Sequence, residues 1–456
     1  MLDTITRSVD DRSARGIAVS ISRLITSGSL PVGSKLPTVR QLSRRLGVSP
    51  TTVGEAWRAL ADIGAIETLG RNGTIVRQPT GPGSPRRYRK VVADPDNAGH
   101  FAIDLSTGTP DPGLLPDLRP ALAKVSSQDL TGSYLDHAVL PELESRLRVR
   151  WPFEPEELTV VDGAMDALDR ILGVVAHLGD RVVVEDPCFP PVLDLLDQMG
   201  VEIIGVPVDD EGLDLAALEE AMRMQPVAII LQPRAQNPTG VTMTAERARR
   251  VARTIAESPV ADRIVVIEDD HAGDIAVGEL VSIGCHLPDR TVHVRSYSKS
   301  HGPDLRLAAV GGNGAVVSSV ANRRLLGPGW SSRILQSVLL ELLDDPSTIT
   351  SLGHARAEYA RRRRDVVDRL HAAGVVTTGT DGINLWVRVT DERSALLALA
   401  ARGIGGAPGQ PFALDERHPS IRVTVGMLAD DGQRAEVAET LVMAANTSAT
   451  SRRGQR

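Results

Sequence analysis

The sequence predicts an α/β protein whose body has a mainly parallel sheet, preceded by a small helical head and completed by a smaller C-terminal α/β lobe. From about residue 101, short apolar runs alternate with longer amphipathic stretches, which is typical of strands joined by helices. Before residue 79 the apolar spacing is helical. Charge divides in the same way: residues 1–90 carry 15 Lys and Arg against 6 Asp and Glu, a net +9, and the remainder carries −16, which gives −7 for the chain. A basic head on an acidic body indicates a nucleic-acid-binding domain joined to a different kind of domain.

Composition narrows the class of protein. With 456 residues, the chain is long enough for two or three domains, and its 42% hydrophobic and 24% charged residues are typical of globular proteins. Two cysteines, Cys188 and Cys285, cannot build a disulfide framework and lack the spacing of a metal site. The first twenty residues contain no apolar signal segment, and no run of about 18 apolar residues predicts a membrane span. We therefore expect a cytoplasmic protein without a metal.

In the head, residues 10–78, the pattern predicts a helix-turn-helix. Apolar residues share a helical face in three stretches, namely Ile17, Ile21, Leu24 and Ile25, then Val39, Leu42 and Leu46, then Val53, Ala56, Trp57 and Leu60. Gly47 is placed to end the second helix. Ser49 and Pro50 are suited to the N-cap and first position of the third helix. The connection 47–49 therefore has the length found in helix-turn-helix motifs.

A β-hairpin wing is predicted after these helices. The extended segments 65–67 and 74–76 flank Gly70-Arg71-Asn72-Gly73, a turn sequence. A winged helix can serve protein contact instead of DNA binding, but the basic charge of the head favours DNA.

These motifs resemble the winged helix of the GntR regulators over nearly all of 15–77. The segments that carry the resemblance are Gly28-Ser29-Leu30-Pro31-Val32-Gly33-Ser34-Lys35-Leu36-Pro37-Thr38-Val39-Arg40, Leu46-Gly47-Val48-Ser49 and Thr51-Thr52-Val53. The resemblance implies that the following residues face DNA: Thr38, Arg40, Ser49, Thr51, Thr52, Arg71 and Gly73. Pro50 and Gly54 stand where relatives often carry arginines that can read bases, so we expect an unusual sequence preference.

Beyond the head, the chain predicts a linker, a body and a tail. Residues 79–100 are rich in Pro, Gly and Arg, which predicts a partly extended linker. In the body, 101–445, apolar runs predict buried strands at 181–184, 227–231 and 264–267. Amphipathic stretches predict helices at 214–224 and 244–256. A long helix at 346–370 opens a smaller lobe, about 346–445, with the four arginines 361–364 expected on a solvated face. The tail, 446–456, is predicted to be disordered.

Lys299 carries the most informative chemistry of the body. It ends Ser296-Tyr297-Ser298-Lys299, after the apolar run 291–294, and Arg306 follows seven residues later. A lysine can form an imine with an aldehyde, whereas hydroxyls and a guanidinium bind phosphate. Because pyridoxal phosphate carries both groups, the sequence predicts this cofactor.

Other segments supply the remaining contacts that this cofactor needs. Ala164 and Met165 open an apolar helix whose N-terminal amides can bind phosphate. Phe189 can stack on the pyridine ring, and Asn237 can bond its phenolic oxygen. Asp269, at the end of the strand 264–267, can keep the pyridine nitrogen protonated. Each feature alone has an ordinary explanation as a helix start, a core residue or a surface charge, but their order together favours a cofactor site.

The body, about 105–430, resembles fold-type I aminotransferases, and the whole chain resembles the MocR subfamily of GntR regulators. The segment Leu105-Ser106-Thr107-Gly108-Thr109-Pro110-Asp111-Pro112 matches a motif of the family. The resemblance implies a Schiff-base role for Lys299 and phosphate binding by Ser296, Ser298 and Arg306. It also implies that Tyr134 reaches the phosphate in the partner subunit and that Arg422 binds an amino acid's α-carboxylate. Since such sites lie between subunits, we expect a head-to-tail homodimer.

Two positions depart from the family pattern. His271 stands where a tyrosine usually lies near the phenolic oxygen of the cofactor, and an imidazole can still donate one hydrogen bond there. Phe189 also replaces a common tyrosine, which keeps the stacking ring and loses a hydroxyl. Both departures preserve cofactor binding and argue against efficient transamination.

Three functions fit these observations. The first is a transcription regulator that binds an operator in double-stranded DNA and senses an amino compound or pyridoxal phosphate itself. The second is an active aminotransferase with a DNA-binding appendage, and the third is a degenerate body that serves only dimerisation. Retention of Lys299 argues against the third, and the charge division favours the first, which is our prediction.

Overall fold

The computed structural model resolves the chain into two compact units. It describes residues 1–9, 11–62, 65–68, 73–77, 85–91, 101–127, 132–415 and 418–448. The first unit comprises Met1–Arg86 with Ala176–Val182 and Pro191–Ile203, and the second comprises the rest. The finer boundaries expected at 78, 100, 346 and 445 stay predictions.

The head contains the predicted helix-turn-helix and hairpin. Its elements are α1 (Leu2–Ser8), α2 (Ala14–Thr26), α3 (Val39–Leu46), α4 (Pro50–Asp62), β1 (Ile66–Thr68) and β2 (Thr74–Val76). Gly47 ends α3 in the left-handed conformation, with φ 71°, which glycine adopts without steric cost. The Ser49 hydroxyl accepts the amide of Thr52 at 3.1 Å, as an N-cap should. β1 and β2 pair as an antiparallel hairpin, which confirms the wing.

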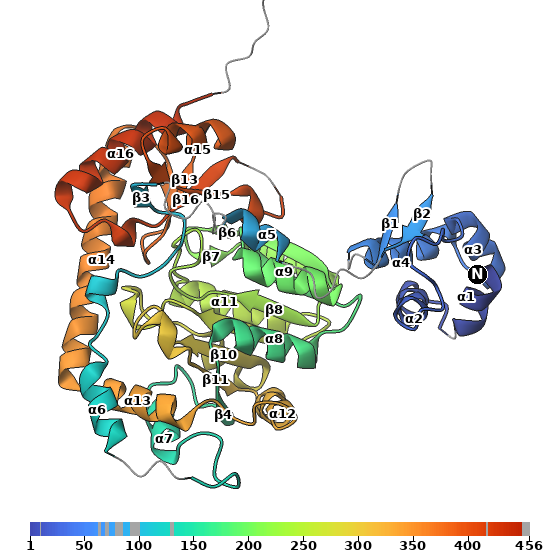
Figure 1. Ribbon diagram of the computed structural model, residues 1–456, viewed down its shortest axis with the longest axis horizontal. Coiled ribbons are helices and arrows are strands. Elements are labelled where there is room, and N and C mark those ends of the chain that lie inside the picture. Colours follow the sequence, from blue (N-terminus) through green and yellow to red (C-terminus); the bar gives the residue numbers. More distant parts are fainter. Residues whose placement is uncertain are drawn as a thin grey trace, which may run out of the picture. The chain divides into compact units, whose positions relative to one another are not determined.

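The body is built on an eight-stranded sheet with strand order β4-β11-β10-β9-β8-β5-β6-β7 (Figure 1). The strands are β4 (Glu157–Val161), β5 (Arg181–Asp186), β6 (Glu202–Asp209), β7 (Gly212–Leu213), β8 (Ala228–Leu231), β9 (Val265–Asp270), β10 (Thr291–Ser296) and β11 (Ala308–Gly312). β8, β9 and β10 pair in parallel, whereas β11 is antiparallel to β10 and β4. β9 runs further than the predicted 264–267, because it pairs with β10 as far as Asp270 and Arg295. Asp269 therefore lies inside the strand, close to its end.

Helices connect these strands, as the alternating pattern predicted. They are α8 (Ala164–Val175), α9 (Pro190–Met199), α10 (Leu215–Arg223), α11 (Ala245–Ala256) and α12 (Gly314–Arg324). Further helices in the body are α6 (Arg119–Ser126), α7 (Pro141–Val149) and α13 (Arg333–Asp344). Short 3-10 helices are η3 (Pro112–Leu114), η4 (Gly273–Ile275), η5 (Ile283–Cys285), η6 (Pro288–Arg290), η7 (Pro303–Leu305), η8 (Gln410–Phe412) and η9 (Val425–Met427).

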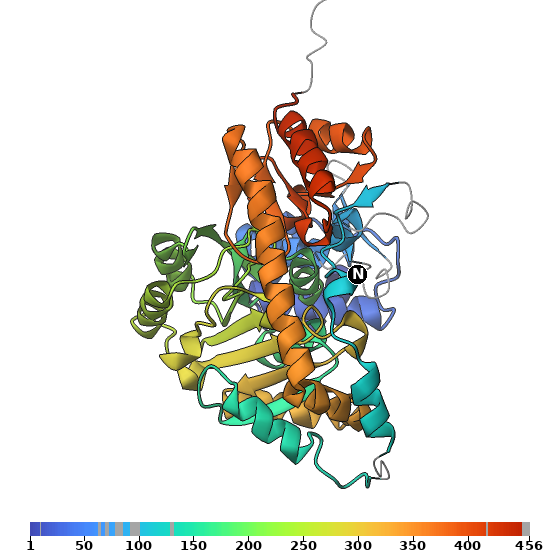
Figure 2. The same ribbon diagram turned by 90° about the vertical axis from the view of Figure 1, so that its left-hand side faces the viewer.

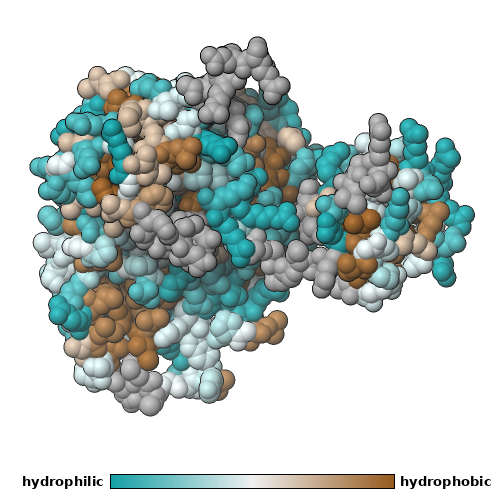
Figure 3. All heavy atoms as spheres, turned by 45° about the horizontal axis from the view of Figure 1, so that its top comes forward, coloured by the Kyte–Doolittle hydropathy of each residue, from teal (hydrophilic) through white to brown (hydrophobic). Residues whose placement is uncertain are grey.

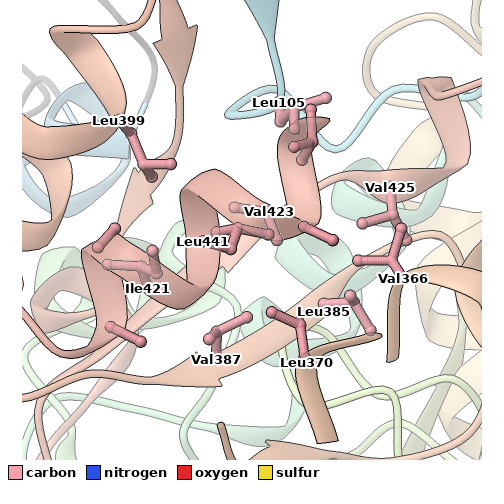
Figure 4. Close-up of a cluster of buried hydrophobic side chains, with 14 of the residues drawn as sticks. Leu105, Val366, Leu370, Leu385, Val387, Leu399, Ile421, Val423, Val425 and Leu441 are labelled. Carbon is pink, nitrogen blue, oxygen red and sulfur yellow. The ribbon is translucent and has the colours of Figure 1, made fainter. Parts of the chain in front are cut away.

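The long helix α14 (Pro346–Ala372) leads into the C-terminal lobe as one continuous element (Figure 2). The lobe contains β12 (Thr377–Thr378), β13 (Leu385–Arg388), β15 (Ala407–Pro408) and β16 (Ser420–Val423), with α15 (Glu392–Ala400) and α16 (Asp431–Ala445). Its core gathers aliphatic side chains from α14, α16 and the sheet, including Val366, Leu385, Val423 and Leu441 (Figure 4). Leu105 joins this core, since β3 (Ile103–Asp104) pairs in parallel with β14 (Ile404–Gly405).

The expectation of a solvated arginine face at 361–364 is wrong for two of the four residues. Arg361 and Arg364 are exposed, but Arg362 and Arg363 are buried. Arg362 pairs with Asp111 at 2.7 Å and with Glu358 at 2.8 Å. The Arg363 guanidinium donates to backbone carbonyls of the lobe, among them Thr378 at 2.9 Å and Gly379 at 3.1 Å. These partners explain why both charges are tolerated inside.

The linker is not wholly extended, because a helix, α5 (Arg86–Val91), lies within the expected range 79–100. Among the described residues, no helix is long and apolar enough to cross a bilayer. On the face shown in Figure 3, hydrophobic residues form separate patches within a largely hydrophilic surface.

Candidate functional site

Lys299 lies just beyond the carboxyl end of β10, at the edge of the sheet where β8 and β9 also end. Its Nζ is 3.1 Å from Nδ1 of His271, and Nε2 of His271 is 2.9 Å from the carbonyl oxygen of Ala235. A carbonyl only accepts, so Nε2 carries the ring proton and Nδ1 accepts from the lysine. Burial, with Lys299 adding to it, lowers the pKa of His271 to about 3. Burial and the charge of Arg422 lower the pKa of Lys299 to about 8, which favours a nucleophilic amine.

Asp269 is buried on β9 and has one unsatisfied oxygen. Its Oδ2 accepts the side-chain amide of Gln232 at 2.8 Å, but its Oδ1 has no hydrogen-bond partner among the residues that the structure describes. Burial raises the pKa of Asp269 to about 6, against the effect of the Gln232 hydrogen bond. A buried carboxylate oxygen without a partner marks the place of a missing donor, and a protonated ring nitrogen is such a donor.

Gln232, which the sequence reading missed, ties this region together. Besides bonding Asp269, its side chain accepts the backbone amide of Asn237 at 2.7 Å. Its backbone amide donates to Glu185 at 3.0 Å. Burial raises the pKa of Glu185 to about 8. The signal that could have revealed Gln232 is its position, since a polar residue directly after a buried parallel strand lies at the ligand-binding edge.

A second group of residues meets at the start of α8, where Ala164 and Met165 lie. Arg306 has a left-handed backbone, with φ 49°, and its guanidinium donates to the carbonyl of Asp162 at 3.3 Å. A Cβ on Gly163, whose φ is 106°, would approach this guanidinium to 3.1 Å. The structure therefore brings Arg306 to the N-terminus of α8, where free amides and a positive charge can bind a phosphate.

Ser296 and Ser298 lie beside Lys299 in the sequence. Ser296 is buried at the end of β10, and its hydroxyl accepts the amide of Ser298 at 3.4 Å. Ser296 thus ends the strand and Ser298 lies on the segment that follows it, next to Lys299; phosphate binding by the two hydroxyls stays a prediction.

Arg422, on β16 of the C-terminal lobe, is also buried. Its guanidinium donates to Oδ1 of Asn237 at 3.3 Å and to the carbonyl of Ser106, and its Nε has no partner among the described residues. It lies over the Phe412 ring, 5.0 Å from the centroid. Burial lowers the pKa of Arg422 to about 10. Arg422 and Asn237, 185 residues apart, are thus brought together.

Two further predicted residues, Tyr134 and Phe189, are aromatic, and each has a ring contact. Tyr134 is 89% exposed, and its ring contacts Trp330 with 5.9 Å between centroids. Its contact with the cofactor phosphate of a partner subunit stays a prediction. Phe189 is half-buried and meets Tyr88 edge-on at 6.5 Å.

In the head, the predicted DNA-facing residues divide by exposure. Thr38, Arg40, Ser49 and Thr51 are exposed. Thr38 is engaged as the N-cap of α3, in a capping box with Gln41, so its hydroxyl already has a structural role. Thr52 is half-buried, and its hydroxyl is 2.9 Å from that of Ser49. At the wing, Gly73 has φ 91° and lies against Lys35, whereas Arg71 lies outside the described residues.

Comparison with known proteins supports both halves of the fold. Residues 13–76 match the family of bacterial regulatory proteins called the gntR family, and residues 102–441 match the family of class I and II aminotransferases. The chain is 34% identical over 429 residues to the vitamin B6 salvage pathway transcriptional repressor PtsJ of Salmonella typhimurium, which covers 92% of this chain and 96% of that protein. It is 26% identical to the probable rhizopine catabolism regulatory protein MocR of Rhizobium meliloti, over 88% of this chain and 86% of the relative.

Among solved structures, the body is similar to LysN, an α-aminoadipate aminotransferase from Thermus thermophilus in complex with N-(5'-phosphopyridoxyl)-L-leucine. The TM-score is 0.67 with 22% identity, over 79% of this chain and 96% of LysN. These matches confirm the predicted fold class, a winged head followed by an aminotransferase-type body.

Proposed function

Because the chain belongs to the MocR subfamily of GntR-family transcriptional regulators, with a winged head and an aminotransferase-type body, we propose that it binds pyridoxal phosphate at Lys299 and uses the site to control DNA binding. The observation that carries the proposal is the buried Oδ1 of Asp269, which has no hydrogen-bond partner in the part of the chain that the structure describes and lies in the same cluster as the Lys299 amine. A protonated pyridine nitrogen would satisfy that oxygen.

The residues present fit this cofactor at each of its functional groups. Lys299 would attach to the aldehyde, and its lowered pKa leaves a useful fraction of neutral amine near pH 7. Arg306 and the amides at the start of α8 would hold the phosphate, with Ser296 and Ser298 beside them. When bound, pyridoxal phosphate supplies an electron sink for bonds at an attached amino group.

His271 and Asn237 have narrower roles in the proposal. His271 is fixed as the neutral ring with its proton on Nε2, so its Nδ1 can accept a hydrogen bond from the lysine but cannot donate one to the cofactor. The donor to the phenolic oxygen would then be Asn237, whose backbone is held by Gln232. Phe189 would cover one face of the ring.

Two kinds of signal fit the site. The relative PtsJ is named as a repressor of vitamin B6 salvage, which favours pyridoxal phosphate itself as the signal. Arg422, buried and close to Asn237, favours an amino compound that carries a carboxylate. Tyr134, exposed in one chain, is suited to complete the phosphate site of a partner subunit in a head-to-tail homodimer.

An active aminotransferase is the second candidate, since Lys299, Asp269, Asn237 and Arg422 are all retained. The two functions differ in turnover. A regulator changes its spectrum with an amine once per site, whereas an aminotransferase converts many equivalents of amino donor and keto acid.

The deciding experiment is a visible absorption titration of the purified chain with pyridoxal phosphate, followed by a DNA-binding assay on an operator fragment with and without the cofactor. We expect a visible band that Lys299→Ala lacks, and a cofactor-dependent change in DNA affinity. A DNA affinity indifferent to cofactor and to every amine would overturn the proposal. Repeated turnover would establish the aminotransferase instead.

A further inference from the structure

The short helix α5 lies next to the residues proposed to bind the signal. The Tyr88 ring meets Phe189, the proposed stacking residue, edge-on at 6.5 Å. Val91, one turn later, is buried in a cluster with Ala407 and Phe412. Phe412 is in turn the ring over which Arg422 lies. Figure 1 shows α5 beside β15, which carries Ala407.

Polar contacts fix the same helix in place. Arg87 donates to the carbonyl of Ala413 at 3.2 Å, and Lys90 lies 3.5 Å from the side-chain oxygen of Gln410. An isolated helix of six residues is unstable in water, so α5 exists because of these contacts with the lobe. The fraction of molecules in which α5 is helical therefore depends on how well the lobe surface in contact with it is formed.

That surface includes both proposed recognition groups for an amino compound. Phe189 would cover the cofactor ring, and Arg422 would bind a carboxylate attached to it. The Tyr88 phenol also lies close enough to influence the pKa of Arg422. Tyr88 keeps 39% of its surface exposed, so it has area that a ligand could bury.

Resting on the proposed function, we propose that Tyr88 contacts the carboxylate-bearing amino compound bound at Lys299 and Arg422, and that this contact tightens the docking of α5 on the C-terminal lobe. Such a contact can influence the head because α5 lies between the head and the body in the sequence. The segment matched to DNA-binding proteins ends at residue 76, and residues 77–85 join it to α5. Because the chain passes through α5 between these two parts, a ligand that tightens α5 acts on the segment that connects them.

Trypsin provides the test, because Arg86, Arg87, Arg89 and Lys90 are cleavage sites within α5. The experiment uses the full chain, with N-(5'-phosphopyridoxyl)-L-leucine as the probe and mass spectrometry to follow cleavage at these sites. The cleavage rate tracks the undocked population of the helix. We expect the probe to slow cleavage about fivefold, the factor expected of one aromatic contact.

Substitutions at Tyr88 separate docking from folding. Tyr88→Ala should be cleaved faster than the natural chain without probe, and the probe should no longer slow it. Tyr88→Phe, which keeps the ring, should match the natural chain without probe. Cleavage that is equal in Tyr88→Ala and the natural chain would show that Tyr88 does not hold α5. A probe that binds, by calorimetry, without slowing cleavage would overturn the coupling.

Failure of the proposed function gives a different result. If the probe does not bind, the ligand coupling falls, whereas the absorption titration with pyridoxal phosphate decides separately whether the cofactor proposal stands. The comparison of variants without probe still decides whether Tyr88 docks the helix.

Discussion

The Nζ of Lys299 donates to Nδ1 of His271 at 3.1 Å, and the histidine is fixed in the tautomer that accepts. A tyrosine at this position would present a hydroxyl that both donates and accepts. The imidazole instead positions the amine before any ligand arrives. It stays neutral over the whole physiological range, since burial lowers the pKa of His271 to about 3.

The rate at which pyridoxal phosphate develops a visible band with the protein should rise with pH through about 8 and then level off. Only the neutral amine attacks an aldehyde, and burial sets the pKa of Lys299 to about 8. Stopped-flow absorbance between pH 6 and 10 measures this profile. A second inflection at about 6.5, the ordinary pKa of histidine, that persists in Asp269→Asn would mean that His271 titrates and that its assigned tautomer is wrong, since the Asp269 carboxyl, with a pKa of about 6, cannot contribute in that variant.

Asp269→Asn should stabilise the cofactor-free protein at pH 7 while weakening cofactor binding. The folded-state pKa of Asp269 is raised to about 6, above its unfolded value of ~3.9, so the natural chain loses stability as pH rises between these values. The loss amounts to roughly 2–3 kcal/mol above pH 6, and the amide avoids it. Thermal melting of the cofactor-free proteins at pH 4 and pH 7 provides the check. A variant that melts below the natural chain at pH 7 would contradict the assignment.

Lys299→Ala and Arg40→Ala should each abolish one function and spare the other. Lys299→Ala removes the covalent attachment, so the visible band disappears while DNA affinity without cofactor is unchanged. Arg40 is exposed on α3, and its loss should cost about 1–3 kcal/mol in DNA binding while the band remains. Fluorescence anisotropy with an operator fragment and absorbance follow the two readouts. The separation of roles is wrong if either variant loses both.

Arg362→Ala should destabilise the body by about 3 kcal/mol, because it leaves Asp111 and Glu358 without their buried partner. Arg364→Ala, two residues later on the same helix, is the matched control. Its side chain is exposed, so the change should stay within about 0.5 kcal/mol. Chemical denaturation of the two variants measures both effects, and equal stability would show that the buried pairing contributes nothing.

The sequence was sufficient for the parts of the site that follow from strand ends. Asp269 and Asn237 each come after an apolar run, and parallel strands carry such residues to one edge of the sheet. The resemblance added Arg422 and Tyr134, which no local pattern marks. The position of Arg422 depends on how the C-terminal lobe packs on the body, and the role of Tyr134 on a partner subunit that the proposed homodimer would supply.

The features that the sequence reading missed depend on contacts across long stretches of chain. Arg362 is buried because Asp111 lies opposite it, 251 residues earlier, and no local rule distinguishes it from Arg361. α5 escaped prediction because a run of Arg, Tyr and Lys after a Pro- and Gly-rich segment has the composition of a linker. Its helical form depends on Val91 and Tyr88 finding partners in the lobe.

The Arg422 guanidinium is already engaged by Asn237 and by the carbonyl of Ser106. A carboxylate that binds Arg422 replaces some of these hydrogen bonds as well as adding new ones. Much of the binding free energy gained from the arginine is therefore offset by the hydrogen bonds that are lost. Such an exchange favours fast release. The occupancy of the site would then rise and fall with the ligand concentration, and the first molecule to bind would not remain trapped.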